Sequence, residues 1–599
     1  MNIFKPKYIK KGLNYIAENG VGAFTEKLKS ILYGINYYYP GWFEAHKADA
    51  EELKRQREEK LSYNPLISIV VPTFNTPEKY LREMIESVIC QSYQNWQLCI
   101  ADGSNTNEKA GALAAGIIKE YAEKDSRIVC KFLEKNGGIS DNTNAALSLA
   151  TGEYVGLFDH DDLLTPDALY HIAKALNEEK YDILYTDEDM MDSKGKKLMN
   201  PKFKPDFSMD LLMVHNYITH FFVAKTTLLH KVGGFDREFD GAQDYDIILK
   251  CVEQSKNIKH IPRMLYHWRV HKASTAGNPE SKLYAYENGK RALQAHLDRI
   301  GVKAVVENTD MWGLYDVKYI IDEQPLISII IPNKDHIDDL DKCVSSIYDR
   351  SDYKNIEFII VENNSTEDKT FKYYKEMETK HENFHVVYWK KEFNYSAINN
   401  YGVSFAKGDY LLLLNNDTEI MSTNALNRML GICMRDDVGV VGAKLFYEDD
   451  TIQHAGVVIG FGGYAGHVFN GMKDNELGYM MRAKINSNFS AVTAACLLTK
   501  KSVFSEVGGL SEEFVVACND VDYCLKVREQ GLLVTYCADA KWHHYESKSR
   551  GYEDTPEKQE RFAKEKSLFQ QRWKTVLENG DPFYNINFPV SLPPFTLAQ

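Results

Sequence analysis

The stretch Leu66-Ile-Ser-Ile-Val-Val-Pro-Thr-Phe-Asn75 returns almost unchanged as Leu326-Ile-Ser-Ile-Ile-Ile-Pro-Asn-Lys-Asp335. Each copy begins with an apolar run rich in β-branched residues, which is typical of strands buried on both faces of a sheet. Ile67 and Ile327 are 260 residues apart. Repeats that stack into a solenoid recur at roughly 20 to 50 residues, so this period indicates two whole domains.

Two acidic clusters follow each copy, in the same order. Asp159-His-Asp-Asp162 in the first half corresponds to Asn415-Asn-Asp417 in the second half. Further on, Gln243-Asp-Tyr-Asp246 corresponds to Asn519-Asp-Val-Asp522. The shared order indicates that the clusters belong to the duplicated domain.

The composition indicates an ordinary globular protein. Of the 599 residues, 44% are hydrophobic and 26% are charged, which argues against disorder. The formal net charge of −14 argues against a nucleic-acid partner, because phosphate binding depends on accumulated lysine and arginine. Sugar, nucleotide and protein partners remain open.

The N-terminal segment raises the question of membrane contact. No apolar stretch approaches the roughly 18 residues that a spanning helix needs, so we expect a cytoplasmic protein. The first thirty residues nevertheless carry six lysines against two glutamates, with apolar residues at helical spacing. Such a helix either lies on an anionic membrane face or packs on the first domain with its lysines in water.

Strands alternate with helices in each half. Apolar runs at 67–71, 97–101, 128–133 and 154–158 are separated by helical patterns, which predicts a doubly wound α/β sheet that is parallel in this part. The predicted divisions are an N-terminal helical segment at 1–63, a first domain at 64–300, a linker at 301–325, a second domain at 326–551, and a C-terminal helix (558–577) and tail within 552–599.

Acidic residues sit where such sheets bind ligands, beyond the carboxyl ends of the strands. Asp102 follows one predicted strand, and the cluster from Asp159 to Asp162 follows another. Carboxylates that converge there repel one another, and a divalent cation such as Mg²⁺ or Mn²⁺ relieves the repulsion. A loop that caps the next helix is the alternative explanation for one such cluster. The other acidic residues follow the cluster in the same order in both halves, which favours a cation site.

The sequence resembles glycosyltransferase family 2. The first half carries V-P-T-F-N, A-D-G-S, N-G-G-I-S, G-E-Y-V-G-L-F-D-H-D-D, Y-T-D-E-D, G-G-F-D and A-Q-D-Y-D. The second carries V-E-N-N-S-T, G-D-Y-L-L-L-L-N-N-D-T-E, G-G-L-S, N-D-V-D-Y-C-L and H-H-Y-E-S-K-S-R-G, and is similar to the rhamnosyltransferase-like branch. The resemblance covers about residues 66–275 and 326–551. It implies two GT-A (Rossmann-like nucleotide-sugar-binding) domains in tandem, of a kind associated with bacterial surface polysaccharides such as O-antigens and rhamnose-rich wall polymers.

The resemblance also implies roles for individual residues. Asp244 and Asp520 become the catalytic bases, which take a proton from the acceptor hydroxyl. The expected nucleotide-sugar contacts are Thr73, Asp102, Asp159, Asn333, Glu362 and Asn415. The expected metal ligands are Asp161, His267, His271, Asp417, His543 and His544. Acceptor contacts are expected from Glu188 and Trp268, each of which could equally belong to the core.

The second half departs from the family pattern. Glu362 replaces the nucleotide-contacting aspartate, and Asn415 and Asn416 replace two aspartates of the metal motif, so that Asp417 is the remaining carboxylate. Asparagine still ligates through its carbonyl oxygen, which favours an active second site. The alternative is a degenerate domain kept for scaffolding or acceptor binding.

These observations predict a bifunctional, inverting glycosyltransferase that depends on Mn²⁺ or Mg²⁺. Its donors are expected to be dTDP- or UDP-sugars. Its acceptor is expected to be a lipid-linked oligosaccharide or polysaccharide at the inner face of the cytoplasmic membrane. The alternatives are an enzyme with one working domain and a glycan-binding assembly protein without catalysis.

Overall fold

The computed structural model describes residues 34–271, 283–545 and 555–598. The chain separates into two compact units. The first comprises residues up to Lys204, Ile218–Ala292 and the residues from Asn587 onward; the second comprises Pro205–Tyr217 and Leu293–Ile586. The domain boundaries that we predict from the sequence remain predictions. The lysine-rich N-terminal pattern lies outside the described residues.

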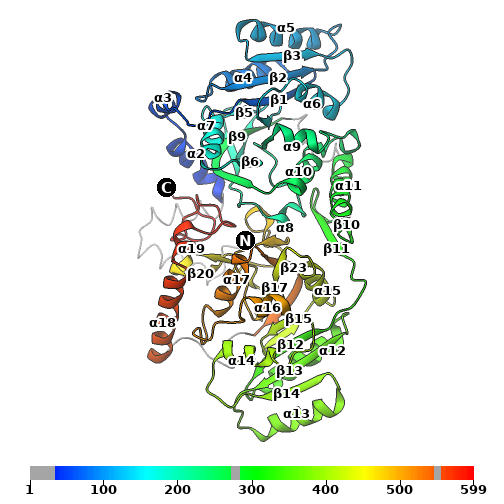
Figure 1. The fold of residues 1–599 in the computed structure, drawn as a ribbon, viewed down its shortest axis with the longest axis vertical. Helices are drawn as coiled ribbons and strands as arrows, with labels where there is room; N and C mark the ends of the chain where they lie inside the picture. Colours follow the sequence, from blue (N-terminus) through cyan, green and yellow to red (C-terminus); the bar gives the residue numbers. More distant parts are fainter. Residues whose placement is uncertain (1–33, 272–282, 546–554, 599) are drawn as a thin grey trace, which may run out of the picture. The chain divides into compact units, whose positions relative to one another are not determined.

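The first unit is built on a mixed sheet (Figure 1). The apolar run at Ile67 forms the central strand of a parallel set, which is flanked by an antiparallel strand, β8. In spatial order the strands are β3 (Ile128–Phe132), β2 (Trp96–Asp102), β1 (Ile67–Thr73), β4 (Tyr154–Leu157), β8 (Val223–Lys225), β6 (Ile183–Asp192), β9 (Ile258–Val270) and β5 (Leu163–Leu164), with β7 (Leu198–Lys202) paired to β6.

Helices cover this sheet because their apolar faces complete its core. Leu81, Met84, Ile85 and Val88 of one helix are buried against the β1 side chains Ile67 and Ile69 and their neighbours. The helices are α2 (Ile35–His46), α3 (Ala50–Glu58), α4 (Glu78–Ile89), α5 (Lys109–Lys124), α6 (Ile139–Leu147), α7 (Ala168–Glu178), α9 (Thr226–Lys231), α10 (Gln243–Gln254) and α11 (Leu283–Arg299), whose C-terminal part belongs to the second unit.

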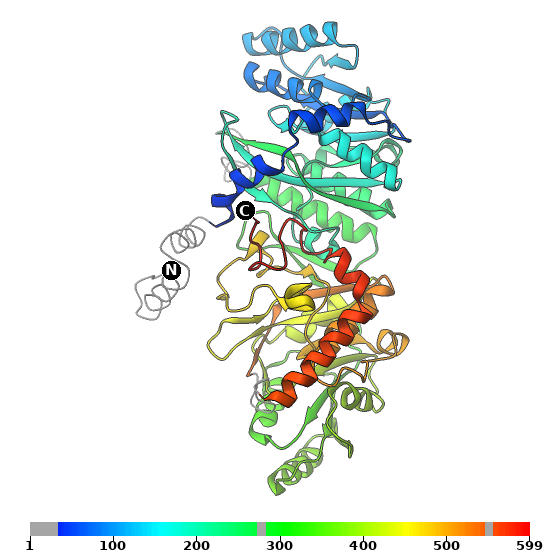
Figure 2. The same cartoon turned by 90° about the vertical axis from the view of Figure 1, so that its left-hand side faces the viewer.

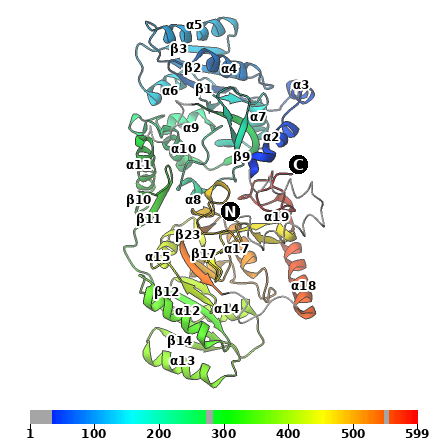
Figure 3. The ribbon, with the colours of Figure 1, turned by 180° about the vertical axis from the view of Figure 1, so that it is seen from behind.

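The second unit repeats this topology (Figure 3). The spatial order is β14 (Phe384–Tyr388), β13 (Ile356–Glu362), β12 (Ile327–Asn333), β15 (Tyr410–Leu414), β22 (Cys496–Lys500), β17 (Val438–Phe446), β23 (Leu533–His544) and β16 (Thr418–Ile420). Shorter strands are β10 (Ala304–Asn308), β11 (Tyr315–Tyr319), β18 (Ile452–His454), β19 (Val457–Ile459), β20 (Ala465–His467) and β21 (Ser487–Asn488). The helices are α8 (Met209–Leu212), α12 (Ile337–Arg350), α13 (Asp368–Lys380), α14 (Tyr395–Val403), α15 (Ala425–Cys433), α16 (Lys501–Glu506), α17 (Asn519–Glu529), α18 (Pro556–Arg572) and α19 (Lys574–Asn579).

The duplication extends to single atoms. The amide of Gly152 donates to Ser68 Oγ over 2.9 Å, and the amide of Gly408 donates to Ser328 Oγ over 2.9 Å. A Cβ at Gly152 would lie 2.5 Å from the Leu66 carbonyl oxygen, and the corresponding distance at Gly408 is 2.4 Å. Both positions therefore require glycine, because the chain entering the fourth parallel strand passes directly against the central one.

The C-terminal helix differs in length from its prediction. A single helix was expected at 558–577, whereas α18 ends at Arg572 and α19 begins at Lys574. The break lies at Trp573, whose indole N–H donates to Asp522 Oδ1 over 3.0 Å. In the described part of the chain, no helix combines the length and apolar character needed to cross a bilayer.

Candidate active sites

The aspartate-rich loop after β4 meets the end of β9 in the first unit. His271 follows β9, and its Nε2 lies 2.7 Å from Asp161 Oδ2. Arg269 fixes this arrangement, because its Nε donates to the Asp161 carbonyl over 2.5 Å and its backbone amide donates to Asp162 Oδ1 over 2.7 Å. The structure thus brings together two of the residues expected to bind a metal ion.

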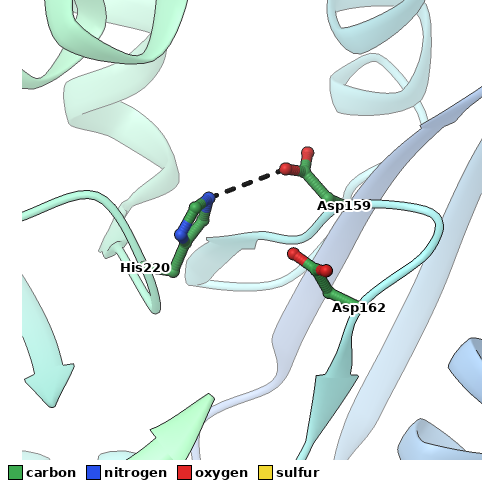
Figure 4. A group of neighbouring side chains, drawn as sticks. All are labelled: Asp159, Asp162 and His220. Atoms are coloured by element: carbon green, nitrogen blue, oxygen red, sulfur yellow. Dashed lines mark ion pairs between the residues drawn. The ribbon is translucent and has the colours of Figure 1, made fainter. Parts of the chain in front are cut away.

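A second group of side chains faces the same loop. Ligand atoms of Asp159, Asp162 and His220 lie within 4.8 Å of one another (Figure 4). Burial raises the pKa of Asp162 well above its usual range, and the negative charges of Asp161 and Asp159 raise it further. Such a group of mutually repelling carboxylates is the environment that a bound cation stabilises.

His220 was not singled out as a site residue from the sequence. Its Nε2 lies 3.6 Å from Asp159 Oδ2, its Nδ1 lies 3.3 Å from Glu188 Oε2, and its ring stacks on Tyr266 at 4.5 Å. Burial lowers its pKa, but the two carboxylates outweigh this and raise the pKa to about 10. The two carboxylates thus favour the protonated, positively charged form of the imidazole.

The expected base of the first unit, Asp244, lies in the first turn of α10. Burial and the negative charge of Asp159 raise its pKa, and the positive charge of His220 opposes the shift. The electrostatic coupling to Asp159 and His220 assigns Asp244 to the surroundings of the aspartate-rich loop. A carboxylate with a raised pKa is a better proton acceptor than an exposed one.

The expected nucleotide contact Asp102 is buried at the end of β2. Its Oδ1 accepts hydrogen bonds from Thr73 Oγ1 over 2.9 Å and from Ser104 Oγ over 2.6 Å. Its Oδ2 is buried and accepts no hydrogen bond from the part of the chain that the structure describes. A buried carboxylate oxygen without a donor is costly, so Oδ2 is available to a donor group on a ligand.

Two other expected site residues are placed differently, and a third stays near the site. His267 Nδ1 lies 2.6 Å from Asp189 Oδ1, so the partner of His267 is Asp189 rather than Asp161. Glu188 is 1% exposed, and its oxygens accept from Lys202, Lys204 and Thr219, so direct acceptor binding no longer fits it. Trp268 lies beside His220, with 5.4 Å between the ring centroids, which keeps it near the site.

The second unit repeats the pairing of aspartate and histidine. Asp417 Oδ1 lies 3.2 Å from His544 Nε2, and Asn415 Nδ2 lies 3.1 Å from the same nitrogen. On the other side of the ring, Nδ1 lies 2.6 Å from Gln453 Oε1. Because an amide oxygen only accepts, Nδ1 donates a hydrogen bond to Gln453, and Nε2 is the ring nitrogen that faces Asp417. A histidine whose other ring nitrogen is held by a hydrogen bond and a neighbouring carboxylate are ligand types that metal sites use.

The expected second base shares a cavity with this pair. A cavity of about 390 Å³, here called the Asp417 cavity, is lined by Asn415, Asn416, Asp417, Asp520 and His544 among others. Asp520 is the second residue of α17, as Asp244 is the second residue of α10, and its Oδ2 accepts from the Ala494 amide over 3.2 Å. Carboxylates from distant parts of the sequence therefore meet around one space.

A neighbouring cavity carries Asn333, one of the expected nucleotide contacts of this unit. It measures about 370 Å³ and is lined by Asn333 and Asn416, the latter shared with the Asp417 cavity. Asn416 Nδ2 donates to Asn333 Oδ1 over 2.6 Å. Glu362 takes the place of Asp102 and accepts from Ser365 Oγ and Tyr374 Oη over 2.6 and 2.8 Å. The substitution in the motif thus keeps a buried carboxylate at the end of β13.

His543 does not join the site. Consecutive residues of a strand point to opposite faces, and His543 Nε2 lies 2.9 Å from the exposed Asp450. His544, the next residue, faces Asp417 instead. The expected role of His543 as a metal ligand is therefore wrong, because its side chain pairs with Asp450.

Comparison with known proteins matches both halves of the chain to the same family. The family model "Glycosyl transferase family 2" matches residues 68–233 and 328–508. Uncharacterized protein y4gI of Sinorhizobium fredii is 42% identical over 564 residues, which is 93% of this chain and 61% of that protein. O-antigen biosynthesis protein RfbC of Myxococcus xanthus is 35% identical over 550 residues, which is 91% of this chain and 42% of that protein. The chain thus spans less than two thirds of either relative.

Among solved structures, S. aureus TarS 1–349 in complex with UDP-GlcNAc is 22% identical, with a TM-score of 0.32, over 39% of this chain and 66% of that one. The two matched stretches begin within β1 and β12, and the predicted α/β class with two GT-A domains in tandem is confirmed. Because the family model matches more than half of the residues, in two separate stretches, this chain belongs to glycosyl transferase family 2.

Proposed function

We propose that the chain is an inverting glycosyltransferase with two catalytic sites, each moving a sugar from a nucleotide-sugar donor to a growing bacterial surface glycan. The observation that carries the proposal is the Asp417 cavity, which is lined by Asp417, His544 and Asp520. A metal-binding pair and a carboxylate base around one space are the groups that sugar transfer requires.

In the first site we assign the proton transfer to Asp244. The acceptor hydroxyl oxygen attacks the anomeric carbon, the bond from that carbon to the diphosphate oxygen breaks, and the proton of the hydroxyl passes to the Asp244 carboxylate. The raised pKa of Asp244 supports this assignment, since it strengthens the base. Attack opposite the leaving group inverts the configuration at the anomeric carbon.

We assign a divalent cation, Mn²⁺ or Mg²⁺, to Asp161 and His271 in the first site and to Asp417 and His544 in the second. The short distances within these pairs and the repulsion within the first acidic cluster fit such a cation. When bound, it supplies positive charge for the departing diphosphate. The protonated His220 adds a second positive charge to the first site.

The donor and the acceptor follow from chemistry and from the relatives. We propose that Asp102 and Glu362 each receive a hydrogen bond from the nucleoside of a dTDP- or UDP-sugar. The name of RfbC, O-antigen biosynthesis protein, supports a surface polysaccharide as the product. A lipid-linked acceptor at the inner membrane face, and rhamnose as one of the sugars, are further parts of the proposal.

A panel of nucleotide sugars tests this function. dTDP-rhamnose, UDP-glucose and UDP-N-acetylglucosamine are each added to the full chain with Mn²⁺ or with EDTA, and the melting temperature and the release of nucleoside diphosphate are measured. A true donor stabilises the fold by mass action. We expect at least one sugar to raise the melting temperature and to be turned over only with the metal. Binding without turnover of any sugar would favour a glycan-binding assembly protein.

A further inference from the structure

The C-terminal helix α18 carries a buried carboxylate that the proposed mechanism does not use. Glu565 is 4% exposed. Its Oε1 accepts from the amides of Val515 and Val516 over 3.1 and 3.3 Å, and its Oε2 accepts from the amide of Ala517 over 2.6 Å. Three consecutive backbone N–H groups thus converge on one carboxylate, an arrangement of charge-assisted hydrogen bonds that fixes a loop.

This loop forms part of the catalytic site of the second unit. Val516 and Ala517 line the Asp417 cavity, and α17 with Asp520 in its first turn begins just after them. Cys518 caps that helix with φ 63°, a left-handed conformation that is strained for a residue with a side chain. A strained residue persists only where its surroundings hold it in place. The hydrogen bonds from the amides of residues 515–517 to Glu565 provide this restraint.

The same helix braces a second wall of the cavity. Phe562 lines the Asp417 cavity, and its ring packs against Tyr464, another lining residue, with 5.6 Å between centroids. Gln570 Nε2 donates to the Gly463 carbonyl over 2.8 Å. Figure 2 shows α18 in red on the second unit. The segment that contains Gly463 and Tyr464 and the loop before Asp520 are therefore held by one helix.

The end of α18 fixes the other acidic residue of the motif. Asp522 Oδ1 accepts from Arg572 Nη1 and from Trp573 Nε1, both over 3.0 Å. Asp522 is fully buried, and Ser511 Oγ donates to its Oδ2 over 2.6 Å. Of the two aspartates in Asn519-Asp-Val-Asp522, Asp522 is thus an anchor, and Asp520 is the one that lines the cavity.

We propose that α18, which lies beyond the stretches matched by the family model, completes the second catalytic site and that Glu565 is the positioning residue that holds the loop before Asp520. This inference rests on the proposed catalytic role of Asp520. We expect Glu565 to affect turnover rather than donor binding. It contacts the backbone that positions Asp520, and it does not line the Asp417 cavity.

The test uses the full chain with Asp244→Asn, so that sugar transfer reports on the second site alone. Glu565→Gln keeps the shape of the side chain, but its amide group faces N–H donors with one acceptor oxygen instead of two. Misplacing a catalytic group by a fraction of an ångström costs on the order of 10- to 100-fold in rate. We expect a fall of that size in kcat for the donor that the Asp244→Asn chain turns over, with KM changed less than about twofold.

Glu560→Gln is the matched control, since Glu560 lies on the same helix and makes an exposed ion pair with Lys564. Hydrogen exchange of the 515–517 amides gives a second readout, which we expect to accelerate in Glu565→Gln and not in Glu560→Gln. If Glu565→Gln fails to fold, Glu565→Asp, which keeps the charge on a shorter side chain, is expected to give an intermediate kcat.

The outcomes distinguish a failure of the proposed function of the second site from a failure of the proposed role of Glu565. If Asp520→Asn leaves transfer by the Asp244→Asn chain intact, the proposed function of the second site is wrong. If Asp520→Asn abolishes transfer while Glu565→Gln and Glu565→Asp behave like Glu560→Gln, the role of Glu565 is overturned and the proposed function stands.

Discussion

His271 Nε2 lies 2.7 Å from Asp161 Oδ2, although 110 residues separate them in the sequence. The second unit repeats the relationship between His544 Nε2 and Asp417 Oδ1, at 3.2 Å. In both units the pair joins the loop after the fourth strand of the parallel set to the end of the last long strand. This geometry, repeated within one chain, is the structural basis of the two cation sites that we propose.

The first prediction concerns metal affinity. In the chain with Asp520→Asn, which isolates the first site, His271→Asn is expected to raise the Mn²⁺ concentration for half-maximal activity about 10- to 100-fold, the range typical of weakened metal ligation. His267→Asn is the control, because His267 pairs with Asp189. Titration of sugar transfer with Mn²⁺ measures this concentration for the first site alone. An equal Mn²⁺ dependence of the two variants would exclude His271 as a ligand.

The second prediction concerns pH. Since burial and Asp159 raise the pKa of Asp244, we expect kcat/KM of the first site to fall, as the pH is lowered, with a midpoint above 3.8. His220 opposes this shift, so His220→Gln removes a positive charge and moves the midpoint to higher pH. Activity is lost on the acidic side because the protonated carboxyl no longer accepts a proton.

Measurement of kcat/KM between pH 4 and 8 in the Asp520→Asn background checks this expectation. His171→Gln serves as the control, since His171 pairs with Asp167 outside the site. An unchanged or lowered midpoint in His220→Gln would contradict the assigned coupling between His220 and Asp244.

The third prediction concerns the donor. Asp102→Asn keeps the hydrogen bond at Oδ1 but removes the charged, unsatisfied acceptor at Oδ2. A hydrogen bond to a charged group contributes about 1.5–3 kcal/mol, so the dissociation constant of UDP or dTDP at the first site is expected to rise roughly 10- to 100-fold. Isothermal titration measures it, with Asp125→Asn, whose carboxylate pairs with Arg127, as the control. Unchanged nucleotide affinity would remove Asp102 from the nucleotide site.

The fourth prediction concerns the stability of the second unit. Arg435 Nη1 lies 2.6 Å from Asp210 Oδ1, and both side chains are buried. Asp210 also accepts from Asn488 Nδ2 over 2.6 Å. Arg435→Met leaves the Asp210 charge buried without its cation and is expected to cost about 3–5 kcal/mol.

Denaturation in urea, followed by fluorescence, measures this loss. Lys318→Met is the matched control, because its partner Glu307 is half exposed and such pairs contribute about 0–1 kcal/mol. A loss below about 1 kcal/mol for Arg435→Met would show that the Asp210 charge finds other compensation.

Much of this architecture is predictable from the sequence because its signals are local. The β-branched runs at Ile67 and Ile327 predict buried strands, and both form the centre of a parallel set. The same local pattern predicts Asp161 and Asp417 at strand ends. Their pairing with His271 and His544 was expected from family resemblance rather than from spacing.

Other features depend on contacts between distant segments. His220 lies in a loop without periodicity, and its protonation follows from Glu188 on β6 and Asp159 after β4. Glu565 carries no motif, and its role is visible only once α18 meets the loop before α17. The sequence places His543 and His544 next to each other, so it does not show which one faces Asp417. The structure shows that His544 does, because consecutive side chains of a strand point to opposite faces.

The central claim is that two sites in one chain transfer sugar independently. The most direct measurement compares the products formed by the full chain, by Asp244→Asn, by Asp520→Asn and by the double variant, with a bacterial lipid-linked glycan as acceptor and the donors that the nucleotide-sugar panel identifies. We predict that each single variant loses a different part of the product pattern and that the double variant forms none. Retention of the full pattern by either single variant would contradict the two-site account.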